Sequence, residues 1–130
     1  MDLRRFIPRW FRPRATTLGE RGEEAAARYL RRQGYRIIGR RVAVARGDLD
    51  LVAVDGQTVV IVEVKTRSSH GAGGAVAAVD DAKQNQLRRL AQLYVNQHGL
   101  MHCPVRFDVV AITWPEGVRR PEIDHYIAAF

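Results

Sequence analysis

The chain of 130 residues contains a single cysteine, Cys103, and this scarcity excludes two kinds of cross-linked fold. One cysteine cannot form an internal disulfide, and no cysteine and histidine pattern with the spacing of a zinc site surrounds it. We therefore interpret Cys103 as a small, buried or half-buried apolar residue. The fold must be stabilised by a hydrophobic core, and a chain of this length can form one such core as a single domain.

Long apolar runs are also missing. The longest stretches, residues 59–62 and 75–79, are far shorter than the ~20 residues that a membrane-spanning helix needs. An apolar segment near the N-terminus, which a secretory signal would require, is absent as well. With 46% hydrophobic and 27% charged residues, the composition is that of an ordinary globular protein. The sequence thus predicts a folded cytoplasmic protein without a membrane partner.

The net charge of +7 is concentrated at the N-terminus. Residues 1–17 contain five arginines and one aspartate, so they carry more than half of the positive excess. Phe6, Trp10 and Phe11 lie between these arginines, a composition that suits phosphate contacts and stacking on bases. A poorly ordered terminus is an equally good interpretation. We divide the chain into a basic tail, residues 1–17, which we expect to be flexible, and one domain, residues 18–130.

A helix is predicted over residues 18–33 from its helical spacing of apolar residues. Gly34 suits the left-handed position that ends a helix, and either of the two threonines before residue 18 suits the N-cap. Glu23 falls beside Leu30 at the edge of the buried stripe, whereas the neighbouring acidic residues point to solvent. Glu23 is therefore a candidate site residue. The alternative is an acidic residue that is merely favoured near the positive end of the helix dipole.

A second helix is predicted from Asp80 or Asp81 to about Gln97. Lys83 and Gln84 lie on the same stripe as its apolar residues, one turn toward the N-terminal end. We therefore expect both side chains to reach toward the sheet instead of toward water.

Alternating apolar residues predict strands in the remaining segments. The run over residues 59–67 is apolar on both faces at its start, which indicates a central, buried strand. The predicted strands cover residues 35–44, 48–54, 59–67 and 107–113, with a short edge strand at 123–128.

Strict alternation in the second predicted strand places Leu49 and Leu51 on one face and Asp50 on the other. If the next hairpin closes around residues 56–57, stepping back along both strands places Asp50 directly opposite Glu63. A slip of one residue would put the two carboxylates on opposite faces. Directly opposed side chains lie within about 4.5 to 5.5 Å at Cβ, close enough for two carboxylates to hold one cation.

Hydrolysis of a phosphodiester needs a cation that polarises the phosphate and activates water, and carboxylates are the ligands that Mg²⁺ prefers. Asp50 and Glu63 meet this need, with Mn²⁺ as a substitute metal. Lys65 emerges on the same face as Glu63, where its ammonium group can orient water and stabilise developing charge. Glu23 could complete the carboxylate set. The alternative is a cross-strand salt-bridge cluster, but charged groups that close a buried strand are costly without a partner or a metal.

Several short motifs, in order along the chain, resemble a known family. Residues 47–52 (GDLDLV) and 62–67 (VEVKTR) look like the acidic core of the PD-(D/E)XK restriction-endonuclease-like superfamily. With further motifs, the chain from about residue 19 to 130 resembles the YraN-like family of small bacterial proteins. These further motifs are Gly22-Glu23-Glu24 before Tyr29-Leu30, Gly34-Tyr35, Ala78-Val79 before Lys83, and Arg106-Phe107-Asp108-Val109-Val110.

The resemblance implies a single α/β domain, in which a mixed β-sheet is flanked by helices around a restriction-endonuclease-like core of order αβββαβ. It also implies that Asp50 and Glu63 are metal ligands, that Lys65 is the catalytic lysine, and that Glu23 is a helix-borne acidic residue. We expect nucleic-acid contacts from a further set of residues. This set is Arg46, Arg67, Lys83 and Gln84.

Three hypotheses follow for the function. The first is an Mg²⁺-dependent nuclease that hydrolyses DNA phosphodiester bonds, at branched or damaged structures. The second is a nucleic-acid-binding module that keeps the nuclease fold without cleaving, and the third is a structural role in a larger assembly. The first is favoured by the complete set of Asp50, Glu63 and Lys65, because a pure binder gains nothing from carboxylates placed where phosphates approach. A homodimer is compatible with each of the three.

Overall fold

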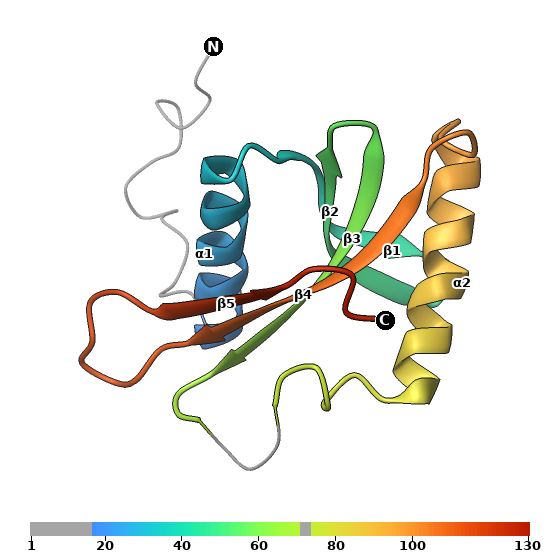
Figure 1. The fold of residues 1–130 in the computed structure, drawn as a ribbon. Helices are drawn as coiled ribbons and strands as arrows, with labels where there is room; N and C mark the ends of the chain where they lie inside the picture. Colours follow the sequence, from blue (N-terminus) through green and yellow to red (C-terminus); the bar gives the residue numbers. More distant parts are fainter. Residues whose placement is uncertain (1–16, 71–73) are drawn as a thin grey trace, which may run out of the picture.

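In the computed structural model, which describes residues 17–70 and 74–130, two helices pack on a five-stranded sheet (Figure 1). The order α-β-β-β-α-β, followed by a short edge strand, agrees with the order predicted from the sequence. Every boundary lies within two residues of its predicted position. The elements are α1 (Leu18–Arg32), β1 (Arg36–Val44), β2 (Gly47–Asp55), β3 (Thr58–Arg67), α2 (Asp81–Gln97), β4 (Val105–Thr113) and β5 (Glu122–Tyr126).

The limits of the helices are fixed by local hydrogen bonds. Thr17 caps α1, because its side chain accepts a hydrogen bond from the backbone N–H of Glu20. Asp80 caps α2, because its side chain accepts a hydrogen bond from the backbone N–H of Lys83. At the other end of α1, Gly34 has a φ of +93°, the left-handed conformation that glycine adopts without strain. The basic tail predicted over residues 1–17 lies outside the described residues, except for Thr17.

The sheet is mixed, with the strand order β1-β2-β3-β4-β5. β3 and β4 are parallel because α2 connects them as a crossover, and the other neighbouring pairs are antiparallel. β3 is therefore the central strand, as the sequence predicts. Among the described residues, no helix is both long enough and apolar enough to span a membrane.

The core consists of two apolar layers, one on each face of the sheet. In β3, Val60 and Val62 pack with α1, whereas Val59 and Ile61 pack with α2, so the strand is buried on both faces. The next residue of the α2 side is Glu63, which is only 6% exposed. The alternation of side chains along β3 that buries Val59 and Ile61 on the α2 side therefore buries the Glu63 carboxylate there as well.

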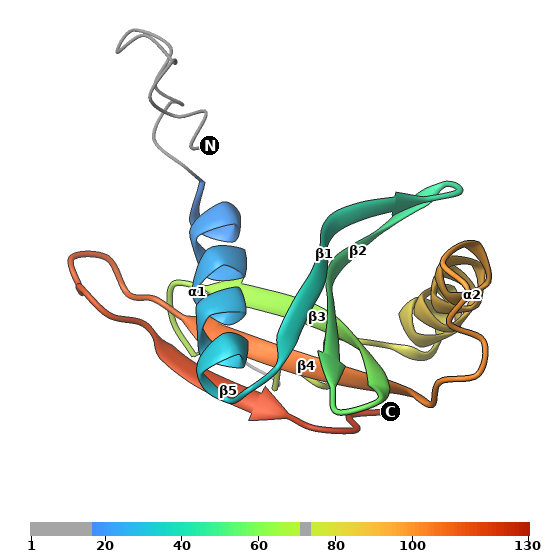
Figure 2. The same cartoon turned by 90° about the horizontal axis from the view of Figure 1, so that it is seen from above.

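The hairpin of β1 and β2 bends away from the rest of the sheet (Figure 2). Arg41 lies near the bend with a φ of 45°, which is uncommon for a residue with a side chain. The prediction that Leu49 and Leu51 share a face is wrong, because Leu49 packs with the α2 layer and Leu51 with the α1 layer. Asp50 lies between these two leucines, where strict alternation is lost. At the tip of the hairpin, Gly47 packs closely against Leu90 of α2.

The start of α1 lies directly on the end of β3. Gly22 is buried there, and a Cβ added to it would lie 2.8 Å from the Cβ of Thr66. A larger residue would push the helix away from the strand. This close approach brings Glu23 to the end of β3 that carries Glu63 and Lys65.

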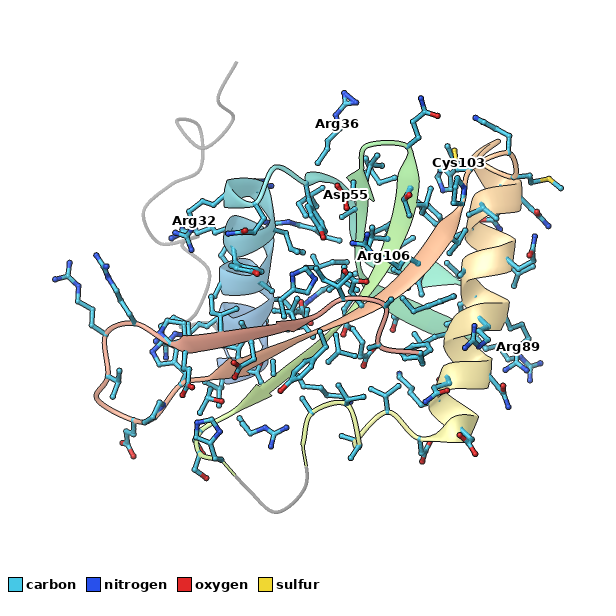
Figure 3. The ribbon with its side chains drawn as sticks, viewed as in Figure 1. Arg32, Arg36, Asp55, Arg89, Cys103 and Arg106 are labelled. Carbon is cyan, nitrogen blue, oxygen red and sulfur yellow. The ribbon has the colours of Figure 1, made fainter. Side chains whose placement is uncertain are left out.

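A polar cluster ties β4 and β5 to the far end of α1. The fully buried carboxylate of Asp108 accepts hydrogen bonds from Arg106, His125 and the backbone N–H of Ala128. These donors hold the pKa of Asp108 below its usual value despite burial. Tyr29 of α1 contacts His125 in turn, with 3.2 Å between Oη and Nδ1. Arg106 extends the cluster to Asp55 in the hairpin (Figure 3).

Candidate active site

Asp50 lies where β2 and β3 separate. Backbone pairing follows the predicted register from Asp55 opposite Thr58 to Leu51 opposite Val62, and then ends. Asp50 and Glu63 are the next residues on the two strands. Instead of continuing the ladder, the Asp50 carboxylate accepts a hydrogen bond of 2.9 Å from the backbone N–H of Val64. This bond holds the carboxylate beside the exit of β3.

Two lysines converge on the buried Glu63. The Nζ of Lys65 lies 3.5 Å from Glu63 Oε1, and the Nζ of Lys83 lies 3.8 Å from the same oxygen. Lys65 is on β3, two residues after Glu63, and Lys83 comes from the first turn of α2. The prediction that Lys83 reaches toward the sheet is confirmed. The two lysine side chains are each about two-thirds buried, and their ammonium groups compensate the charge of the glutamate.

Asp50 is in an environment that opposes its ionisation. Burial is the largest cause, the neighbouring Glu63 charge adds to it, and together they raise the pKa of Asp50 to about 6. The hydrogen bond from Val64 and the charge of Lys83 lower the pKa but do not offset these causes. Asp50 takes part in none of the ion pairs among residues 17–70 and 74–130. The fold therefore holds two carboxylates together at a cost in stability.

Glu23 faces the site from α1, but it is held by Arg41. The Nε of Arg41 lies 2.6 Å from Glu23 Oε2, and this pair raises the pKa of Arg41. The negative charge of Asp50, which lies opposite Arg41 across the β1–β2 hairpin, also raises the pKa of Arg41. The structure thus brings Glu23 to the rim of the site through Arg41 and does not join it to the carboxylate pair.

The other expected nucleic-acid contacts are spread around this centre. Arg46 is exposed in the turn between β1 and β2, and Arg67 is the last residue of β3, half-buried beside β4. The side-chain Nε2 of Gln84 donates to the carbonyl of Val79 at 3.1 Å, in the turn that precedes α2. The nucleic-acid contact expected of Gln84 stays a prediction.

The donor set fits a magnesium ion better than a metal that needs a complete protein cage. Among the described residues, no group of three or more histidine, cysteine, aspartate or glutamate side chains could hold a metal. Mg²⁺ is usually bound through one or two carboxylates, with waters and substrate phosphates as its other ligands. Asp50 and Glu63 supply two such carboxylates. The residues present therefore fit Mg²⁺ or Mn²⁺.

Arg41 is a site residue that sequence reasoning missed. Exposed and less exposed residues alternate along β1 except at Arg41, and the neighbouring residues do not predict a positive φ there. Its partners become visible only when α1 is placed over the hairpin. One sequence signal could have indicated a cationic residue here. Glu23 lies at the edge of the buried stripe, and a carboxylate in that position needs a cationic partner.

Comparison with known proteins places the chain in a family. Residues 22–112 match the model described as "Uncharacterised protein family UPF0102". The chain belongs to the UPF0102 family. A UPF0102 protein of Geobacter sulfurreducens is 44% identical over 87% of this chain and 88% of its own length. One of Symbiobacterium thermophilum is 50% identical over 73% of this chain and 80% of its own length. The YraN-like resemblance recognised in the motifs is thereby confirmed.

A solved structure is also similar to this UPF0102 chain. It is described as a repair endonuclease from Pyrococcus abyssi, with a TM-score of 0.47 and 20% sequence identity. The similarity covers 81% of this chain and 42% of that chain.

Proposed function

We propose that the protein is a metal-dependent nuclease that hydrolyses phosphodiester bonds in DNA. The observation that carries this proposal is that Asp50 lies close enough to the buried Glu63 to feel its charge, both residues standing directly beyond the last backbone pair of β2 and β3. Lys65 emerges on the same side of β3 and contacts Glu63. Two hard oxygen ligands and an ammonium group on one rigid edge are the groups that phosphodiester hydrolysis needs.

Each side chain has a distinct role in the proposed reaction. A bound Mg²⁺ would supply Lewis-acid stabilisation of the phosphate and a lowered pKa for the attacking water. Asp50 and Glu63 would hold the ion with one carboxylate each, and the hydrogen bond from the Val64 N–H orients the Asp50 carboxylate. Lys65 positions the attacking water and stabilises the negative charge that grows on the phosphorus oxygens. Lys83, whose Nζ lies 3.8 Å from Glu63 Oε1, would supply a second ammonium group for the substrate phosphate.

A purely structural ion cluster explains the site less well. A cluster that stabilised the fold would pair each carboxylate with a cation, as Lys65 and Lys83 do for Glu63. Asp50 instead remains without an ion pair among the described residues, and its pKa is raised to about 6. The ionised Asp50 therefore lowers the free energy of unfolding, and such an unfavourable charge is typical of a functional site.

The proposal is tested by a cleavage screen with Mg²⁺ and Mn²⁺ on junction, flap, single-stranded and duplex DNA. We expect the wild-type protein to cut at least one substrate and the Asp50→Ala and Glu63→Ala variants to cut none. Asp48→Asn is the matched control, because Asp48 is an exposed acidic residue on the same strand, and it should retain wild-type cleavage. Cleavage retained in both alanine variants would overturn the assignment of the active site to Asp50 and Glu63. Metal-independent DNA binding without cleavage would favour a non-cleaving module.

A further inference from the structure

An open groove of about 980 Å³ runs beside α1, outside the carboxylate pair. It is lined by one side of α1, by β1 and β2, and by the connection between β4 and β5. Its charge is strongly positive, because seven arginines line it against three glutamates. The arginines are Arg21, Arg28, Arg32, Arg40, Arg41, Arg119 and Arg120.

Only part of this positive charge is compensated within the protein. Arg28 and Arg40 share one carboxylate, that of Glu24, at 3.3 Å and 2.8 Å. Arg41 is paired with the other acidic residues of the groove. The remaining four arginines form no ion pair within residues 17–70 and 74–130. They are Arg21, which stacks over the Trp114 ring at 4.1 Å, and Arg32, Arg119 and Arg120.

The groove comes close to Asp50, although none of Asp50, Glu63, Lys65 and Lys83 lines it. Arg41 and Leu51 line it, and these residues flank Asp50, one across the hairpin and the other along β2. From there the groove extends along α1 to Arg32 at the end of the helix, which projects from its outer side (Figure 3). One end of the groove therefore lies beside Asp50, near the place where the proposed reaction would cut a phosphodiester.

The dimensions of the groove suit a repeating polyanion. From Glu20 to Arg32 the helix advances about 18 Å at ~1.5 Å per residue. One strand of a duplex presents roughly five phosphates over that length, at ~3.4 Å each along the axis. A small anionic ligand would need convergent donors in an enclosed pocket, whereas these arginines are spread along an open surface. The ion pairs through Glu24 are exposed and weak, so a phosphate can replace them at little cost.

We propose that the arginine-lined groove along α1 binds the sugar-phosphate backbone of the nucleic-acid segment that leaves the carboxylate site. This inference rests on the proposed nuclease function and adds the surface that holds its substrate. Arg32, Arg119 and Arg120 contact the phosphates of the nucleic acid. Arg41 contacts the nucleic-acid backbone between the groove and Asp50. The contacts position the substrate and carry no base specificity.

The test compares two double variants that remove the same charge. Arg119→Ala/Arg120→Ala removes the loop arginines of the groove. The matched control, Arg36→Ala/Arg89→Ala, removes two exposed arginines that lie away from it (Figure 3). Binding of fluorescein-labelled duplex and junction DNA is measured in EDTA, between about 50 and 200 mM salt. Equal urea midpoints for all proteins establish that the fold is intact.

We expect the groove variant to bind roughly 10- to 100-fold more weakly at the lowest salt, and its log K against log salt slope to flatten by about 1 to 2. The control should keep the wild-type slope. Equal slopes for the two variants would overturn the proposal that the groove binds the nucleic acid. This holds even if Glu63→Ala abolishes cleavage and so supports the proposed nuclease activity. A flattened slope in the groove variant without any wild-type cleavage would leave the groove standing and overturn the nuclease.

Discussion

Replacing Asp50 by asparagine should stabilise the metal-free protein. Asparagine is nearly isosteric, and its carbonyl oxygen can still accept the hydrogen bond from the Val64 N–H. What the substitution removes is a charge that burial and the neighbouring Glu63 disfavour. An aspartate in a favourable salt-bridge cluster would behave in the opposite way.

The size of the effect follows from the pKa of Asp50. Raising the pKa from 3.8 to about 6 corresponds to about 3 kcal/mol, at ~1.4 kcal/mol per pKa unit. Because Asp50 is only partly buried, we expect Asp50→Asn to add about 2 to 3 kcal/mol to the free energy of unfolding at about pH 8. The folded pKa is the higher one, so the wild-type protein loses this stability as the pH rises from about 4 to about 6. The gain from the substitution should therefore vanish below about pH 4.

Urea unfolding in EDTA at several pH values measures this difference directly. Asp48→Asn is the control, and its effect should stay within about 0.5 kcal/mol at every pH because Asp48 is exposed. A destabilised Asp50→Asn variant at about pH 8 would refute the reasoning, because the Asp50 charge would then be held by favourable contacts. A gain that did not depend on pH would assign the effect to packing.

Three other substitutions test separate parts of the structure. Lys65→Met should abolish DNA cleavage while Mn²⁺ binding persists, and calorimetry with a cleavage assay would reveal a merely structural lysine if both persisted. Gly22→Ala should lower the free energy of unfolding by about 1 to 3 kcal/mol, because its Cβ meets Thr66; an unchanged urea midpoint would contradict this packing. Asp108→Asn should cost about 3 kcal/mol at neutral pH by leaving Arg106 poorly compensated. Because the pKa of Asp108 is lowered, that stability should fade as the pH drops below 4, and a loss independent of pH would exclude the ion pair as its source.

Much of the fold could be predicted because local and global signals agree. The cap at Thr17, the left-handed Gly34 and the alternation in β3 are each fixed by nearby residues, and the structure contains all three. The short turn at residues 56–57 also set the register that brings Asp50 next to Glu63. A hairpin turn of known length leaves only one pairing in which both strands keep their apolar faces buried.

The remaining features depend on contacts between elements distant in sequence. The bend near Arg41 moves Leu49 to the other layer, and no periodicity within β2 reveals a change of face. The arginine groove combines α1, β1 and the β4–β5 connection, so it exists only in the folded chain.

Calorimetric titration with Mn²⁺ tests the carboxylate pair most directly. At about pH 8, where Asp50 is ionised, the wild-type protein and Asp48→Asn should bind the ion with similar affinity and enthalpy. Asp50→Asn and Glu63→Gln should each lose this binding. Equal Mn²⁺ binding by all four proteins, or by none of them, would contradict a metal site formed by Asp50 and Glu63.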